Sequence, residues 1–418
     1  MNFIGNLVCK YKKLIIILCL ILSIPAFIGM QKTKINYDIL VYLPKDIETI
    51  KGQNILTNDF HTGAFAIAVT ENMADKDIIT FENNIRKIEG VSKVVSINDL
   101  TGTTIPIEFL PNDIISKVSN GNSKLILITF DDSTSSDRTL AAVEKLREIS
   151  DNSTKIGGMS TMVLDTKELF NSEMTLYVVI AVILCILVLM ISLDSFIVPI
   201  LLILNIGVAI LFNMGTNIFL GDICYITKAI SSVLQLGVTT DFSIFLYHKY
   251  EKAKTENKDI NKAMNAAIHD TLVSVFGSSL TTIAGFLALC TMNLTLGTDI
   301  GIVMAKGVVF GVICVITLFP ALLLVFDKLI SKTKHREILP KFNIIKKITM
   351  KHYKLIFILF LVLLFPAYQA QKKTTVYYKL DSSIPENYGY SIASKTLKDD
   401  FNIVSQDLVL VSKDMSDG

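Results

Sequence analysis

An aspartate that could take part in chemistry lies inside an apolar stretch. It is Asp241, in the run GVTTDF at residues 237–242. A charged carboxylate near the middle of a membrane costs about 2.5–3.5 kcal/mol on insertion scales, so such groups are usually kept for function. A carboxyl group at that depth can hold or release a proton, which suits a proton relay. We therefore interpret Asp241 as a proton-relay residue. The plainer alternative is an aspartate that only bonds to neighbouring helices or lies at a shallower depth.

Several residues around Asp241 could support such a relay. Gly237 lies one turn earlier on the same helix face, where it would let another helix approach closely, although ordinary packing explains it equally well. His248 lies seven residues later on the same stripe and could pass protons at the cytoplasmic mouth, although such a histidine is more often interfacial. Hydroxyl side chains of the next apolar run could reach Asp241 or bond to their own helix. These are Ser278, Ser279, Thr281 and Thr282.

Two lysines also interrupt the apolar runs, Lys228 and Lys306. Each lies within about two turns of the expected outer end of its helix, so we expect both ammonium groups to reach the membrane surface. The sequence contains no phosphate-cradling glycine loop, no zinc-protease histidine pair and no Gly-x-Ser-x-Gly motif. The chain is therefore predicted not to be an enzyme and to need no cofactor, with protons as the coupling ion.

The composition indicates that much of the chain lies in lipid. Of 418 residues, 51% are hydrophobic and only 19% are charged, and the mean hydropathy is +0.52. Soluble domains carry about 25% charged residues. The formal net charge of +2 excludes a nucleic-acid binder that relies on a global positive field. All six cysteines fall in or beside apolar runs, so neither a disulfide framework nor a thiolate zinc site is expected.

Seven apolar runs are long enough, at about 20 residues each, to cross a bilayer. They are Leu14–Met30, Met174–Leu193, Phe196–Leu220, Ile223–Tyr247, Thr271–Leu296, Ile300–Phe326 and Leu355–Ala370. The first run could be a signal peptide. However, no small-residue cleavage site follows it, and six more spans come after it, so we expect an uncleaved helix. The sequence therefore predicts an α-helical polytopic membrane protein.

Basic residues predict the orientation of these spans. The loop after the fourth span carries five lysines between residues 249 and 262, and the loop after the sixth carries eight basic residues between 328 and 351. The alternate connections, 213–222 and 292–299, carry none. Because cytoplasmic loops are enriched in Lys and Arg, we expect a multi-pass cell-membrane protein with a cytoplasmic amino terminus and residues 31–173 outside.

The outer residues 31–173 have the pattern of an α/β domain. The expected strands are 64–69, 91–97, 124–130 and 155–157, and the expected helices are 76–88 and 135–149. Two β-α-β units in series suggest a ferredoxin-like arrangement of helices on a sheet. From Ser160, a helix is expected to run into the second span.

An internal repeat appears when the chain is shifted by 341 residues. The shift places Pro25 on Pro366, Tyr37 on Tyr378 and residues 59–60 on 400–401, both of which read Asp-Phe. A shared apolar bias cannot align polar positions outside the membrane in one register. We therefore expect the seventh span to begin a second copy of the first unit, in a duplicated protein of roughly 700 residues with parallel repeats.

This reasoning divides the chain into six parts. They are the cytoplasmic terminus and first span (1–30), the extracytoplasmic α/β porter domain (31–173), spans two to six (174–326), a basic amphipathic cytoplasmic linker (327–353), the seventh span (354–371) and the start of a second outer domain (372–418). The linker has the pattern of an amphipathic helix on the inner leaflet, although a basic solvated loop would obey the positive-inside rule equally well.

The order of these parts resembles the resistance-nodulation-division (RND) superfamily, specifically its MMPL branch with a sterol-sensing-like helix bundle. Residues 237–242 are similar to the family pattern Gly-x-x-x-Asp-Tyr in the fourth helix. The runs SLTTIAGF at 279–286 and LFPAL at 318–322 fit the fifth and sixth helices, and GGMS at 157–160 fits the end of the porter domain. The order and spacing of these motifs carry the resemblance, which covers the whole chain.

The resemblance implies an exporter driven by the proton-motive force. In that family the fourth-helix acid, here Asp241, takes up and releases protons, and the two halves contribute Asp-Tyr pairs that meet at the centre. Phe242 departs from the pattern because it lacks the tyrosine hydroxyl. Lipids or other hydrophobic compounds are the implied substrates, and membrane lipids with the second half of the polypeptide, or another copy, are the implied partners.

Two other classes remain open. A SecD/SecF-like translocation accessory shares the architecture, although its Asp/Gly-rich signature is absent near residues 36–60. A non-transporting lipid-sensing membrane protein would need only the helix bundle.

Overall fold

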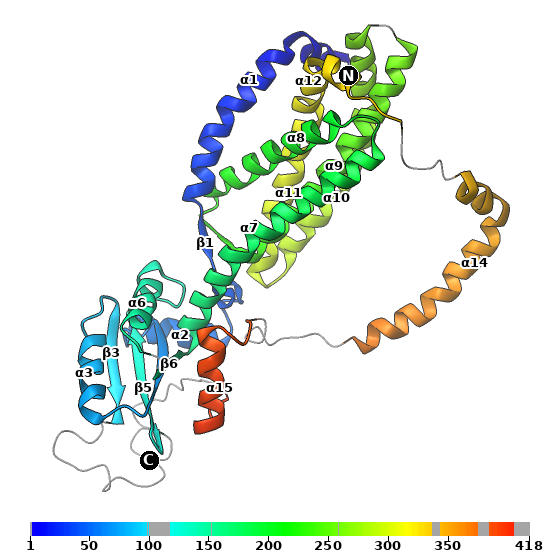
Figure 1. Cartoon of the computed structure of the whole chain (residues 1–418). Coiled ribbons are helices and arrows are strands. Elements are labelled where there is room, and N and C mark those ends of the chain that lie inside the picture. The colour runs from blue at the N-terminus through cyan, green and yellow to red at the C-terminus, as the bar shows by residue number, and fades with distance from the viewer. Residues whose placement is uncertain are drawn as a thin grey trace.

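The computed structural model describes residues 2–97, 99, 118–151, 153–257, 259–336, 343–374 and 384–404. A helix bundle and an α/β domain lie at opposite ends of an elongated molecule, joined by the long helix α7 (Figure 1). In the described residues, seven helices are long and apolar enough to cross a membrane, as the seven apolar runs predict.

The bundle contains six long helices and four short ones. They are α1 (Asn2–Lys32), α7 (Met159–Ser192), α8 (Ile197–Gly215), η3 (Thr216–Phe219), α9 (Tyr225–Glu256), α10 (Ile260–Ala288), η4 (Leu289–Thr291), α11 (Thr295–Ile316), α12 (Leu318–Val325) and α13 (Asp327–Lys332). Helix α10 begins eleven residues before the apolar run that starts at Thr271, because helical structure continues past the lipid boundary. The sixth span breaks at Thr317, since the Pro320 ring would clash with the carbonyl of Ile316 four residues earlier.

Helices α1 and α8 come into backbone contact through two glycines. A Cβ atom at Gly29 would lie 2.2 Å from the Gly215 carbonyl oxygen, and one at Gly215 would lie 2.2 Å from the Ala26 carbonyl oxygen. Small residues allow this close approach, which maximises van der Waals contact in a membrane. The first span is therefore packed into the bundle as a structural helix.

The domain that the sequence predicts to lie outside the membrane, called the outer domain from here on, is a sheet covered by helices. Its elements are β2 (Ala64–Glu71), α3 (Asp75–Ile85), β3 (Val91–Ser96), β4 (Ser119–Asn120), β5 (Ser123–Phe130), α6 (Asp137–Glu148) and β6 (Thr154–Gly157). The strand order is β3-β5-β2-β6, every neighbouring pair is antiparallel, and β4 pairs with β5. Apolar residues such as Ile85, Ile126, Ile128 and Val143 fill the space between sheet and helices. The predicted strands and helices therefore all form, with ends shifted by a few residues.

A second, small sheet joins two distant parts of the chain. Strand β1 (Lys34–Asn36) follows the first span and pairs in parallel with β7 (Asp222–Cys224), which precedes α9. This pairing is not evident in the sequence, because each strand has only three residues. Two short helices then follow β1, namely η1 (Ile39–Tyr42) and α2 (Glu48–Asn58).

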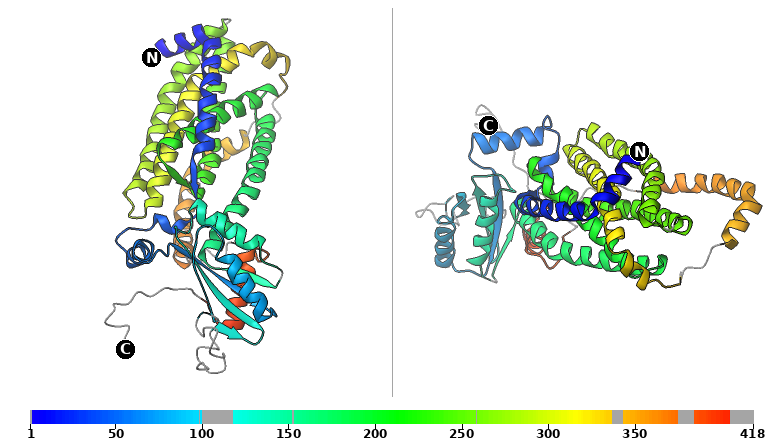
Figure 2. Two further views of the ribbon diagram at one scale, coloured as in Figure 1. Left: turned by 90° about the vertical axis from the view of Figure 1, so that its left-hand side faces the viewer. Right: turned by 90° about the horizontal axis from the view of Figure 1, so that it is seen from above.

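Helix α7 runs without interruption from the outer domain into the bundle, as expected from Ser160 onward (Figures 1 and 2). It starts after Gly158, whose φ of +106° is favourable only for glycine. A Cβ atom at Gly158 would also lie 3.0 Å from the Ala66 Cα atom of β2. The helix therefore begins pressed against the sheet.

The internal repeat is present in the backbone as well as in the sequence. Helix α14 (Asn343–Lys373) has the same 31-residue length as α1, and each contains a proline at the matching position. Both helices bend at matching residues, Tyr11 (φ −111°, ψ 23°) and His352 (φ −119°, ψ 25°). Helical structure thus begins within the linker 327–353, while residues 337–342 lie outside the described part. Helix α14 stands apart from the bundle in Figure 1.

Candidate functional site

Asp241 lies on the open side of α9. Its side chain is exposed, while Phe242 beside it is buried in the bundle core at 9% exposure. Among the described residues, no hydrogen bond or ion pair holds Asp241. The alternative in which neighbouring helices of this chain bond the aspartate is therefore not what the structure has. Since the Phe242 ring faces inward, its missing hydroxyl is not directed at the open side.

The surface around Asp241 contains exposed glycines. Gly237 is exposed, and a Cβ atom placed there would meet nothing within 4 Å. The same holds for Gly277 and Gly285 on α10, the helix that packs beside α9. Glycines at exposed positions of membrane helices let another helix approach closely. The open face of α9 and α10 can therefore accept a further helix next to the carboxylate.

The hydroxyl residues of α10 bond to their own helix. Thr281 and Thr282 both donate to the Ser278 carbonyl oxygen, at 2.8 and 3.0 Å, and Ser279 donates to Phe276 at 3.1 Å. Of the two alternatives that the sequence left open, these three side chains therefore adopt the second, in which a hydroxyl bonds to a carbonyl about one turn earlier in its own helix. His248 is exposed like Asp241, and the two are about 10 Å apart along the helix axis, which is too far for direct contact.

A buried polar column runs along the opposite face of α9, which the sequence reasoning missed. Its members recur every four residues and are at most 3% exposed: Thr227, Ser231, Gln235, Thr239 and Ser243. The Asn213 amide of α8 donates to Gln235 Oε1 at 3.0 Å, and Gln235 donates to the Gly307 carbonyl oxygen at 3.1 Å. The four-residue spacing of polar residues could have revealed this column.

Lys306 belongs to this interior and not to the membrane surface. Its ammonium group donates to the Asn213 carbonyl oxygen at 2.9 Å and to Asn217 Oδ1 at 2.5 Å. Because α11 begins at Thr295 and not near Ile300, Lys306 lies about three turns from the helix start, deeper than expected. Two oxygen acceptors within the bundle therefore replace the surface water that the sequence interpretation assumed.

A cavity of about 610 Å³ lies where the outer domain meets the bundle. Its walls come from α7, η1, the start of α9 and the segment after α14, with mostly apolar and aromatic side chains. Tyr37, Phe170 and Tyr225 form a cluster with ring centroids 5.7–5.9 Å apart. Asp38 and Glu173 are its acidic members. Burial raises the pKa of Asp38 above its ordinary value, despite the hydrogen bond from the Leu40 amide.

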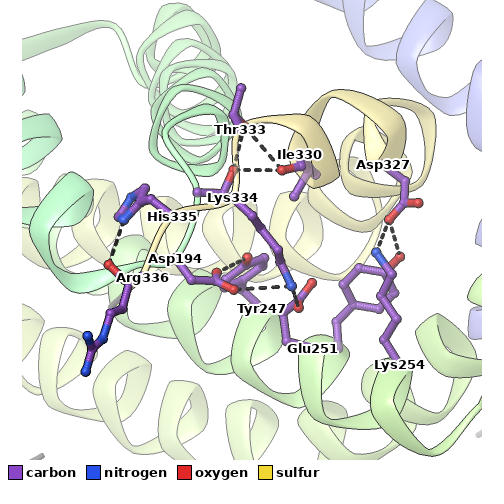
Figure 3. Close-up of polar contacts among 12 residues, drawn as sticks. Asp194, Tyr247, Glu251, Lys254, Asp327, Ile330, Thr333, Lys334, His335 and Arg336 are labelled. Carbon is purple, nitrogen blue, oxygen red and sulfur yellow. Dashed lines mark hydrogen bonds and ion pairs between the residues drawn. The ribbon is translucent and has the colours of Figure 1, made fainter. Parts of the chain in front are cut away.

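The helix ends that the sequence predicts to lie in the cytoplasm are joined by a charged cluster, which we call the Asp194 cluster (Figure 3). Tyr247, fully buried on α9, donates to Asp194 Oδ1 at 2.5 Å, and Lys334 pairs with both Asp194 and Glu251. Burial alone would raise the pKa of Asp194, but the Tyr247 hydroxyl and the Lys334 ammonium outweigh it and hold that pKa below its ordinary value. The cluster anchors the helix that carries Asp241.

A family model matches the chain: that of the MMPL family, over residues 42–342. The chain is 34% identical over 102 residues to membrane protein MJ1562 of Methanocaldococcus jannaschii, covering 24% of this chain and 26% of that protein. It is 26% identical over 136 residues to membrane protein YdfJ of Bacillus subtilis, and this match covers 32% of this chain and 18% of that protein. The matched segments thus span about a quarter or less of these relatives.

Among solved structures, the chain is similar to a crystal structure of SecDF in its super-membrane-facing form. The match has a TM-score of 0.39 and 13% sequence identity, and it covers 77% of this chain and 38% of that one. Likeness at this level carries no conclusion about activity.

Proposed function

The chain belongs to the MMPL family of membrane proteins, and we propose from this that it is an exporter of lipids or other hydrophobic compounds driven by the proton-motive force. Asp241 is the proton-relay residue of this proposal, and protons are the only coupling agent it needs. The outer residues 31–173 form an extracytoplasmic ferredoxin-like porter domain in this picture, which the strand order β3-β5-β2-β6 supports.

The observation that carries the proposal is an unpaired carboxylate on an open, glycine-lined face in the middle of a spanning helix. Among the described residues Asp241 has no partner, and Gly237 leaves space beside it. An ionisable group within a membrane costs free energy of insertion, so such groups are usually kept for a function. A change of protonation alters the free energy of burying the group against another helix. A second unit of the same fold would supply that helix.

The large apolar cavity at the outer end of the bundle supports a hydrophobic substrate. Its 610 Å³ volume and aromatic walls suit an acyl chain or another apolar group. The cavity opens between α7, which enters the outer domain, and α9, which carries Asp241. A rearrangement of α9 on protonation would therefore reach the cavity wall directly through Tyr225 and Ala229.

The test is Asp241→Asn, which keeps the size of the side chain but fixes the neutral state. In vesicles with an imposed pH difference, the Asn variant should lose gradient-dependent movement of a fluorescent phospholipid and the accompanying proton flux. Asp241→Glu should retain part of both, because it still titrates. Asp270→Asn, at an exposed aspartate near the cytoplasmic end of α10, is the matched control and should leave both unchanged.

Full gradient-dependent transport by Asp241→Asn would remove this residue from the mechanism. Absence of gradient-dependent transport in the unmodified chain would instead favour a non-transporting, lipid-sensing role for the bundle.

A further inference from the structure

Helix α15 (Gly389–Phe401), which follows the second copy of the first span, packs on the outer domain of the first unit. Figure 1 shows it beside β6, below the outer end of α7. Its buried side chains Ala393 and Leu397 rest on Gly157, where a Cβ atom would lie 3.1 and 3.2 Å from them. The Tyr390 amide donates to Asp165 Oδ2 at 2.7 Å. We call this place, formed by Gly157 and Asp165, the β6 groove.

The repeat identifies α2 as the counterpart of α15 in the first unit. The shift of 341 residues places Gly52 on Ala393 and Leu56 on Leu397, the two residues that fill the β6 groove. Both helices are followed by a residue with left-handed backbone at matching positions, His61 (φ 51°) and Asn402 (φ 54°). The two helices thus share the leucine at one packing position and a left-handed residue shortly after the helix, whereas the other packing position has glycine in α2 and alanine in α15.

Unlike α15, helix α2 is not packed in a groove among the described residues. None of its eleven residues, all described, is buried, whereas α15 buries two. A Cβ atom at Gly52 would meet nothing within 4 Å, and Ile55 is 43% exposed. An apolar face kept on an otherwise solvated helix is typical of a contact surface.

We propose that α2 docks in the β6 groove of a second repeat unit, so that two units exchange these helices reciprocally. The occupied groove already joins the second unit's helix to the first unit's sheet. Two units of the same fold related by an approximate two-fold axis make the same contact twice, since each patch of such an interface meets its own counterpart. The partner of α2 is therefore the outer domain of the unit that begins at α14.

The exchange also completes the cavity, and this part rests on the proposed function. Ile384 and Tyr390, both from the second unit, form one wall of the 610 Å³ cavity. Their counterparts in the first unit are Leu43 and Thr49, next to and within α2. Each substrate cavity thus takes a wall from the other unit, and a movement between the units changes both cavities together.

The experiment grafts α2 into the groove of the full chain. Residues 389–402 are replaced by the sequence of residues 48–61, in a background without the native cysteines. Cysteines at Asn120 and at position 400 report docking through a short bifunctional maleimide, because the Asn120 side chain contacts the Asp400 carbonyl oxygen in the docked state. The main-chain bond to Asp165 does not depend on side-chain type, so the graft keeps it.

The graft should cross-link within about twofold of the native chain. A matched graft that carries glutamate in place of Leu56 should fall at least tenfold, since a charge would enter the apolar groove. Changing Gly52 to alanine in the graft should raise the yield, because alanine favours the helix and restores the native Ala393 contact. A graft that cross-links no better than its glutamate control, with or without Gly52→Ala, would overturn the proposal.

A second measurement identifies the partner. In the 418-residue chain, a cysteine at Gly52 should react freely with a water-soluble maleimide, since a Cβ atom there meets no described residue within 4 Å. Protection of this cysteine that rises with protein concentration would instead assign the contact to another copy of this chain and overturn the assignment to the second repeat. Neither measurement depends on transport, so their outcome is separate from that of Asp241→Asn.

Discussion

The carboxylate of Asp165 connects three elements, and its removal should loosen two of them by different amounts. It is 1% exposed, and its Oδ1 lies 2.6 Å from Arg147 Nη2, a contact that joins α7 to α6 within the outer domain. Its Oδ2 accepts the hydrogen bond from the Tyr390 amide, which joins α7 to α15. Asp165→Ala deletes both contacts, whereas Arg147→Met deletes only the first.

The expected magnitudes follow from these two contacts. A hydrogen bond to a charged group contributes about 1.5–3 kcal/mol. Because 1.4 kcal/mol is a tenfold change in an equilibrium constant, loss of the Tyr390 contact should make α15 leave its groove roughly 10 to 100 times more often. Loss of the pair with Arg147 should destabilise the outer domain by about 3 kcal/mol, the lower end for a broken buried pair. The Arg147 side chain is 25% exposed and can regain part of its hydration.

Amide hydrogen exchange on the full chain in lipid nanodiscs separates the two effects. In Asp165→Ala, amides of α15 should lose one to two orders of magnitude of protection, and amides of β5 should also exchange faster. In Arg147→Met, β5 should exchange faster while α15 keeps more protection than in Asp165→Ala. Protection of α15 that stays within twofold of the unmodified chain in Asp165→Ala would refute the reasoning, since the Tyr390 contact would then contribute nothing.

Two further predictions concern the Asp194 cluster and the orientation. Tyr247→Phe removes one of the two side-chain contacts that hold the pKa of Asp194 below its ordinary value, the other being that with Lys334. A depressed carboxyl pKa contributes stability that is present above the unfolded-state pKa and is lost as pH falls towards the folded-state pKa. The variant, whose Asp194 pKa lies nearer its ordinary value, should therefore lose less stability on acidification than the unmodified chain; identical acid profiles would contradict this. A cysteine at Asn122 should react with a membrane-impermeant reagent in intact cells, and one at Thr255 only after permeabilisation; the reverse pattern would invert the proposed topology.

The local elements were predictable because their signals are local. Strands such as Ala64–Glu71 and helices such as Asp137–Glu148 form where alternating or helical apolar spacing is found, and Ser136 caps the latter by accepting from the Thr139 amide. The seven spans follow from apolar length. The repeat followed from polar matches, and the equal bends at Tyr11 and His352 bear it out in the backbone.

Predictions about side-chain partners were less successful, because a partner depends on which helices meet. Lys306 was expected at the surface, but Asn213 and Asn217 on another part of the chain bind it inside the bundle. For Thr281 and Thr282 the sequence left two alternatives open, and only the structure shows that both hydroxyls donate to their own backbone. Pairings of this kind connect residues some 70 to 90 positions apart, and no local pattern encodes them.

The amino-acid sequence by itself determined which segments are long and apolar enough to cross a membrane, where the strands and helices of the outer domain lie, and which carboxylate stands in one of those long apolar helices. Hydrophobic burial and helical or strand periodicity act over short distances along the chain, so composition and spacing suffice for these features. The tertiary structure alone decided that Asp241 lies on an open face, that a polar column occupies the opposite face of α9, and that α15 of the second unit fills the groove at Gly157. Those outcomes depend on which surfaces pack together, because a side chain becomes buried, bonded or exposed only when a distant segment covers it or leaves it uncovered.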